Sequence, residues 1–209
     1  PTPSSAASDV YKRQLLDGIT LVVSPLISLM KDQVDALTSR GIRASAVNST
    51  QSPAEQREVL EAAVRGELDL LYVAPERFRF EGAMAQLRRL PLALFVVDEA
   101  HCISKWGHDF RPDYQALGSV IRDLNAPRVA AFTATATAAV REDITRSLGM
   151  TDPMVLVNGF MRDNLHLGVM PVRRMAEKRE HMATMLRGLE GSAVVYCATR
   201  RHCEEVAHG

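Results

Sequence analysis

The chain has 209 residues, and its 25 Lys and Arg residues balance 25 Asp and Glu residues, so that the formal net charge is zero. This balance excludes a histone-like basic protein and a polyacidic tail, although a local basic stripe would suffice to bind nucleic acid. A hydrophobic fraction of 46% with 24% charged residues is typical of a globular chain and excludes intrinsic disorder as its main state.

Residues 1–14 are small and polar without periodicity, and we expect them to be a non-native or disordered tail. Beyond them, five short apolar segments lack the two-residue alternation of a half-exposed strand. They are Thr20–Ser24, Ile42–Val47, Asp69–Val73, Leu92–Val97 and Arg128–Phe132. Such segments predict strands that are buried on both faces.

Helical patterns separate these strands. Residues 26–37 carry an apolar stripe at helical spacing. Ser52 and Glu55 form a capping-box pattern for a second helix, and Thr137 and Gly149 are typical of the two ends of a third. Alternating strands and helices predict an α/β fold with a parallel sheet flanked by helices.

A second series of elements follows Gly149. It comprises extended segments at Val155–Asn158 and Leu165–Val169, a helix over Ala176–Leu189, a buried strand at Ala193–Cys197 and a helix from Arg200. One buried strand cannot form a core, so this series reads as the start of a second α/β domain. We expect a tail over 1–14, an incomplete first domain over 15–152, an interdomain segment over 153–170 and a truncated second domain over 171–209.

The cysteines bear on the cellular setting. Cys102, Cys197 and Cys203 are too few and too scattered for a disulfide framework, and their spacing matches no common zinc motif. No apolar run approaches the roughly 18 residues of a membrane span, and the N-terminus lacks a signal-like apolar region. We expect a soluble, cytoplasmic protein without zinc in this chain and without membrane association.

The fourth strand ends in the acidic box Asp98-Glu99-Ala100-His101. Ligands of open α/β sheets bind beyond the carboxyl ends of the strands. This is the arrangement that a nucleoside triphosphatase needs: Asp98 would hold Mg²⁺ through its water shell, and Glu99 would orient or deprotonate the water that attacks the γ-phosphate. The alternative is that both acids only cap the next helix. His101 would either couple hydrolysis to the following segment or be a satisfied structural histidine.

Residues 102–114 mix aromatic and cationic side chains, namely Lys105, Trp106, His108, Phe110, Arg111 and Tyr114. This mixture can stack bases and neutralise phosphates. The alternative is that Trp106 is a core residue. Neighbouring Gly107 and Pro112 favour an exposed loop and therefore a contact with nucleic acid.

Two further strand ends carry polar groups. Ser24 and Lys31, and the segment that starts at Pro75 and Glu76, could line a single-strand track through side chains and backbone N–H groups. Ordinary helix capping is the alternative, because Ser24 precedes a proline.

These segments together resemble a known family. Ser24–Gln33, Tyr72–Phe78, Asp98–His101 and Phe132–Thr137 resemble motifs Ia, Ib, II and III of superfamily 2 helicases, in that order. Residues 102–114 resemble the aromatic-rich loop of the RecQ family of DNA helicases. Gly159–Leu165 and Ala193–Ala207 resemble the family's interdomain segment and motif IV, so that the resemblance covers about residues 15–209.

The resemblance implies RecA-like domains and ATP-dependent 3′-to-5′ unwinding of DNA in repair and recombination. It implies ATP and Mg²⁺ as cofactors, and single-stranded, forked or junction DNA as partners in a bacterial-type nucleoid. It also implies that Thr133 and Thr135 couple the nucleotide site to DNA, through hydrogen bonds to the acidic box.

The sequence departs from the family in two places. It contains no Gly-x-x-x-x-Gly-Lys-Ser/Thr phosphate loop, and it stops before the family's arginine finger. We therefore expect the chain by itself to hydrolyse ATP poorly or not at all. An RNA helicase of the same superfamily and a non-catalytic module that binds single strands are the alternative functions.

Overall fold

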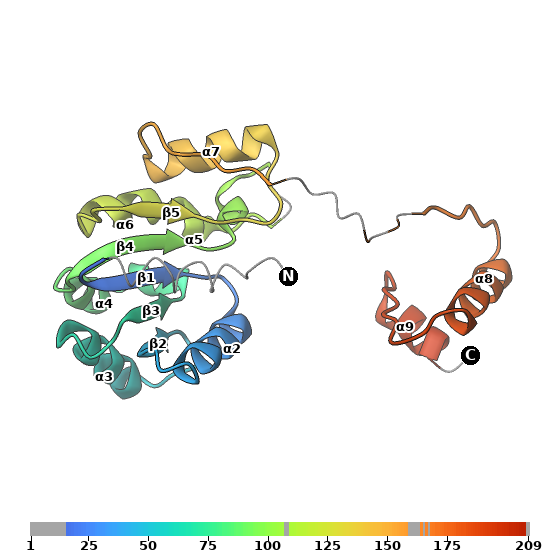
Figure 1. The fold of residues 1–209 in the computed structure, drawn as a ribbon, viewed down its shortest axis with the longest axis horizontal. Coiled ribbons are helices and arrows are strands. Elements are labelled where there is room, and N and C mark those ends of the chain that lie inside the picture. Colours follow the sequence, from blue (N-terminus) through green and yellow to red (C-terminus); the bar gives the residue numbers. More distant parts are fainter. Residues whose placement is uncertain (1–15, 107–108, 159–163, 165, 167, 208–209) are drawn as a thin grey trace. The chain divides into compact units, whose positions relative to one another are not determined.

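The computed structural model describes residues 16–106, 109–158, 164, 166 and 168–207. The chain divides into two compact units, the first ending at Val155 and the second beginning at Leu156 (Figure 1). Within the described residues, no helix combines the length and the apolar character that crossing a membrane would require.

The first unit contains a five-stranded parallel sheet in the order β2-β3-β1-β4-β5 (Figure 1). The strands are β1 (Ile19–Val23), β2 (Ala44–Val47), β3 (Leu70–Val73), β4 (Leu92–Val97) and β5 (Val129–Ala131). Each lies within its predicted segment or one residue beyond it, so the parallel α/β fold is confirmed. The order of the strands in the sheet places β1 and β4 side by side, and because they are parallel their carboxyl ends lie at the same edge.

Helices cover both faces of this sheet. They are α2 (Ile27–Thr38), α3 (Pro53–Val64), α4 (Glu81–Leu87), α5 (Pro112–Gln115), α6 (Leu117–Asp123) and α7 (Ala138–Leu148), with 3₁₀ turns η1 (Pro75–Arg79) and η2 (Ala100–Ile103). Successive strand residues point to opposite faces. Leu71 and Phe95 accordingly join the core formed with α3, α4, α6 and α7, whereas Tyr72 and Val96 join Met30 of α2. Two covered faces explain why the strands lack alternation.

The predicted helix ends are largely confirmed. The Ser52 hydroxyl accepts the Glu55 N–H, and the Glu55 carboxylate accepts the Ser52 N–H at 2.7 Å, which is the full capping box. Thr137 caps α7, and Gly149 ends it in the left-handed region with φ 67°. These caps satisfy backbone groups that each helix terminus leaves without a partner.

Gly118 allows α6 to approach α7 closely. A Cβ atom at this position would lie 2.1 Å from the Ser147 carbonyl oxygen, so the backbone would have to shift. We expect Gly118→Ala to lower the free energy of unfolding by about 1–3 kcal/mol, measured by urea unfolding of the 209-residue chain. Gly82→Ala in α4 is the matched control, because its Cβ meets nothing within 4 Å. Equal free energies of unfolding for the two variants would contradict the steric argument.

The second unit contains α8 (Met175–Arg187) and α9 (Arg200–Ala207), which confirms both predicted helices. The predicted buried strand Ala193–Cys197 is wrong, because these residues form no strand and Tyr196 is 94% exposed. Val155–Asn158 and the described part of 165–169 form none either. A parallel strand needs neighbouring strands and covering helices, and the described residues of this unit provide no strand to pair with.

Candidate active site

The acidic pair lies at the carboxyl end of β4, next to the end of β1. The Asp98 N–H donates to the Val23 carbonyl at 2.9 Å, and the Asp98 side chain is buried. One carboxylate oxygen of Asp98 accepts the Glu99 N–H at 3.0 Å. Burial raises the pKa of the Asp98 carboxyl, and the neighbouring Glu99 charge adds to this effect while the Glu99 N–H opposes it.

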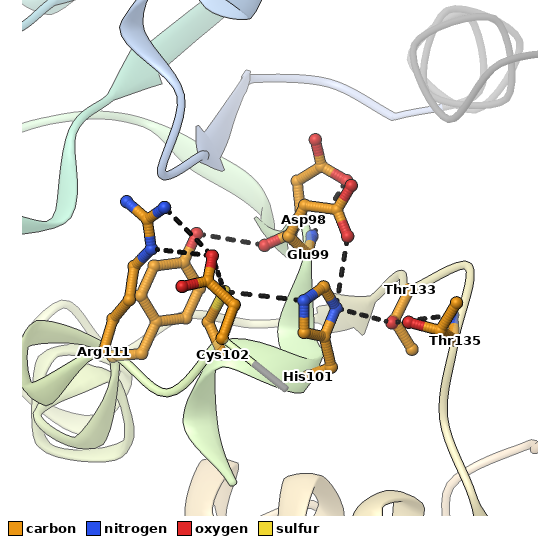
Figure 2. Close-up of polar contacts among 9 residues, drawn as sticks. Asp98, Glu99, His101, Cys102, Arg111, Thr133 and Thr135 are labelled. Atoms are coloured by element: carbon orange, nitrogen blue, oxygen red, sulfur yellow. Dashed lines mark hydrogen bonds and ion pairs between the residues drawn. The ribbon is translucent and has the colours of Figure 1, made fainter. Parts of the chain in front are cut away.

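Glu99 occupies an unusual backbone conformation. Its φ of 46° and ψ of 44° lie in the left-handed region, which costs a residue with a side chain about 1–2 kcal/mol. Although Glu99 precedes η2, its side chain makes no capping hydrogen bond to that turn. The helix-capping alternative is therefore wrong for Glu99. The strained turn instead directs the carboxylate toward His101 (Figure 2).

The donor set at this edge suits Mg²⁺, which prefers carboxylate oxygens and bound water. Among the described residues, the Asp98 carboxylate accepts the Glu99 N–H through one oxygen, which leaves its second oxygen for a cation. The desolvation that raises the pKa of Asp98 would be offset by a bound cation. Asp98 and Glu99 thus have the chemistry and the position for the predicted magnesium and water-activating roles.

His101 connects the acidic pair to the segment after β5. Its Nδ1 atom lies 3.2 Å from the Glu99 carboxylate and 3.0 Å from the Thr133 hydroxyl (Figure 2). The Thr133 hydroxyl also accepts the Thr135 N–H at 3.3 Å. The Ala100 N–H donates to the Phe132 carbonyl and aligns the two segments. The structure therefore brings together the box and both threonines.

Cys102 contacts the other nitrogen of His101. Its sulfur lies 3.9 Å from His101 Nε2 and 3.9 Å from the Asp109 carboxylate. Burial raises the pKa of the Cys102 thiol to about 11, and the Asp109 charge adds to the shift, so the thiol keeps its proton at neutral pH. The three residues place ligand atoms within 4.8 Å of one another. The protonated thiol makes this a hydrogen-bonded cluster.

Arg111 extends these contacts to the loop after β1. Its guanidinium donates to the Asp109 carboxylate at 3.0 and 3.2 Å, and its third nitrogen donates to the Pro25 carbonyl at 3.0 Å. The contacts of Cys102 and Asp109 were not predicted from the sequence. The opposite charges at positions 109 and 111 were a detectable signal for the ion pair, whereas nothing in the pattern pointed to the thiol.

The aromatic residues of the segment 102–114 differ in their burial. Trp106 is 81% exposed, which rules out its alternative assignment to the core, and Phe110 is half-buried. The prediction that Tyr114 stacks bases is wrong, because Tyr114 is fully buried and its hydroxyl donates to the Asp98 carbonyl at 3.1 Å. Tyr114 thus supports the backbone of the acidic box. His108 lies outside the described residues.

The residues predicted to line a single-strand track are unequally accessible. Lys31 is exposed and Glu76 is partly exposed, but Ser24 and Pro75 are buried. Ser24 directly follows β1, its N–H donates to the Val73 carbonyl, and its side chain is fully buried. The structure corrects the expectation for Ser24 and Pro75, whose side chains cannot reach a strand lying on the surface.

The burial of Asp98 predicts that its carboxylate lowers the stability of the folded chain at neutral pH. A carboxyl whose pKa is raised by folding stabilises the protein below its unfolded pKa, and this contribution is lost as pH rises through the folded pKa. We expect Asp98→Asn to raise the free energy of unfolding at neutral pH by about 0.5–2 kcal/mol, measured in urea. The difference in the free energy of unfolding between this variant and the original chain should become smaller as the pH falls toward 3.8, the ordinary pKa of an Asp carboxyl.

Asp32→Asn is the control, since Asp32 is exposed on α2 and its replacement should change the free energy of unfolding little. A variant at position 98 that is less stable than the original chain at neutral pH would contradict the desolvation argument.

Comparison with known proteins places these residues in context. A family model described as DEAD/DEAH box helicase matches residues 5–144. The probable ATP-dependent DNA helicase RecS of Bacillus subtilis (strain 168) is 42% identical over 194 residues, covering 92% of this chain and 39% of that protein. The ATP-dependent DNA helicase RecQ of Pasteurella multocida (strain Pm70) is 40% identical over 192 residues, covering 91% of this chain and 30% of that protein.

Solved structures resemble the fold. The Mycobacterium smegmatis helicase Lhr bound to ssDNA and AMP-PNP matches with a TM-score of 0.63 and 21% identity, covering 100% of this chain and 30% of that one. A hypothetical ATP-dependent RNA helicase from Sulfolobus tokodaii matches with a TM-score of 0.54 and 18% identity, covering 73% of this chain and 44% of that one. The likeness confirms the RecA-like fold that the motifs predicted.

Proposed function

Since the chain belongs to the DEAD/DEAH box helicase family, we propose that it functions as part of an ATP-dependent DNA helicase of the RecQ type. The relatives named above are called ATP-dependent DNA helicases, and this chain spans 30–39% of their length. The observation that carries the proposal is the unbroken series of contacts from the Glu99 carboxylate to the Arg111 guanidinium beside the Trp106 loop. A helicase needs such a link between its hydrolytic and its nucleic-acid sites.

The acidic pair supplies the hydrolytic groups. Magnesium-bound ATP would supply the phosphoryl group whose transfer to water releases free energy. Asp98 would hold the magnesium ion at the edge of the sheet, where the ion would supply positive charge to the phosphates. Glu99 orients the attacking water and accepts its proton, for which its carboxylate is placed by the left-handed turn.

His101 and the two threonines couple ATP hydrolysis at the acidic pair to the segment after β5 and to the loop around Asp109. A change in the charge of Glu99 changes its electrostatic contact with the His101 ring, whose Nδ1 lies 3.2 Å from the Glu99 carboxylate. Because the same ring contacts both Thr133 and Cys102, the change reaches the segment after β5 on one side and Asp109 on the other. Thr133 and Thr135 have the nucleotide-coupling role in this proposal.

The exposed residues of the loop supply the DNA contacts. Trp106 stacks on a base, and Phe110 and Arg111 report its presence through Asp109. Lys31 and the backbone beside Glu76 contact phosphates. The preferred ligands are single-stranded DNA and fork or junction structures. The duplex parts of these structures would be unwound 3′ to 5′ in repair and recombination, in the cytoplasm near the nucleoid.

The test uses the protein expressed from its complete gene, with a 3′-tailed and a 5′-tailed DNA duplex of the same sequence. We expect unwinding of the 3′-tailed duplex only, dependent on ATP and Mg²⁺, and ATP turnover stimulated by single-stranded DNA. Stimulation by RNA above that by DNA would favour an RNA helicase instead. Salt-sensitive strand binding without nucleotide affinity would favour a non-catalytic binding module.

A further inference from the structure

Ser104 links the exposed aromatic loop to the interior. Its side chain is fully buried directly after η2. The Ser104 hydroxyl donates to the Asp143 carboxylate at 2.8 Å and accepts the Trp106 N–H at 3.2 Å. A serine hydroxyl has one proton to donate, so this proton is committed to Asp143 while a lone pair holds the loop.

Asp143 lies on α7, the helix that directly continues the Thr133–Thr135 segment through its cap, Thr137. Its side chain is 26% exposed, and its other carboxylate oxygen accepts from Arg146 at 3.2 Å. Because α7 packs against η2, the carboxylate reaches Ser104 without crossing solvent. The contact from α7 to Trp106 therefore uses no atom of His101, Cys102 or Asp109.

We propose that Asp143 is a positioning residue for Trp106 and acts through the Ser104 hydroxyl. The ionised carboxylate strengthens the Ser104 hydrogen bond, and burial shields it from competing water. Trp106 is thereby held at its backbone while its indole stays exposed for a base. This inference rests on the proposed function for the identity of the ligand, single-stranded DNA, but not for the ordering of the loop.

Trp106 is the one tryptophan of the 209 residues, so the intrinsic fluorescence of this chain reports on that indole alone. The test compares Ser104→Ala, Asp143→Ala and the double variant by time-resolved fluorescence anisotropy. We expect both single variants to lower the residual anisotropy of Trp106 on the nanosecond timescale. The double variant should lower it no further, because both substitutions break the same series of contacts.

Arg146→Ala is the matched control, since it removes the other partner of Asp143 and leaves the Ser104 contact in place. It should retain the anisotropy of the original chain. Circular dichroism checks that each variant is folded. Because Asp143 is partly exposed, its alanine variant decides the question if the change at buried Ser104 prevents folding.

A second readout titrates the same proteins with a single-stranded oligonucleotide, followed by quenching of Trp106. We expect the apparent Kd to rise about fivefold or more in both single variants and to stay unchanged in Arg146→Ala. Unchanged anisotropy in the single variants, or additive effects in the double variant, would overturn the inference. If the original chain does not bind DNA, the proposed ligand fails while the anisotropy result still decides whether Asp143 positions Trp106.

Discussion

Glu99→Gln in the protein from the complete gene is expected to reduce DNA-stimulated ATP turnover by about 10²–10⁴-fold. Glutamine can still hydrogen-bond to water but cannot accept its proton. The substitution removes no capping interaction, because the Glu99 side chain, which is 31% exposed, makes no capping hydrogen bond. Steady-state phosphate release with saturating single-stranded DNA measures the effect.

Glu142→Gln on α7 is the matched control, because this exposed carboxylate lies outside the site and should leave turnover unchanged. Binding of a non-hydrolysable ATP analogue should survive in both variants. Turnover in Glu99→Gln above about one tenth of the original rate would exclude Glu99 as the group that accepts the proton.

Tyr114→Ala should destabilise the chain by about 3–5 kcal/mol, and Tyr114→Phe by about 1–2 kcal/mol. The alanine variant leaves a cavity beneath the acidic box, whereas the phenylalanine variant loses only the 3.1 Å hydrogen bond to the Asp98 carbonyl. Burial raises the pKa of the Tyr114 hydroxyl, so this group is a hydrogen-bond donor at neutral pH. Urea unfolding of the 209-residue chain gives both values.

Trp106→Ala is the comparison variant. Because the Trp106 side chain is exposed, its removal should change the free energy of unfolding by no more than about 0.5 kcal/mol but should weaken the binding of single-stranded DNA. Tyr114→Phe should leave the affinity for single-stranded DNA unchanged. Weaker DNA binding with unchanged stability in Tyr114→Phe would restore the base-stacking role that its burial argues against.

The first domain could be predicted in detail because its signals are local. Buried parallel strands require continuous apolar segments, and the helix ends at Ser52 and Gly149 follow from hydrogen-bonding and backbone rules that act within a few residues. The neighbourhood of Asp98, His101 and Thr133 also followed, since parallel strands bring their carboxyl ends to one edge.

The errors share a different physical origin. Trp106 and Tyr114 are both aromatic residues of the segment 102–114, and only the packing of distant elements decides which of them is buried. Ser24 was misjudged because a hydroxyl at a strand end can face solvent or the interior with the same local sequence. The contact between Ser104 and Asp143 joins residues 39 positions apart, which no periodicity reveals.

The position of His101 between Glu99 and Thr133 has a consequence for the order of events. Both partners face the same nitrogen, Nδ1, which carries either one proton or none (Figure 2). The two contacts are therefore competitors, and a full-strength hydrogen bond to one weakens the other. In the proposed mechanism, a proton taken up by Glu99 would remove the negative charge beside Nδ1, and the contact with Thr133 would then be favoured over the contact with Glu99.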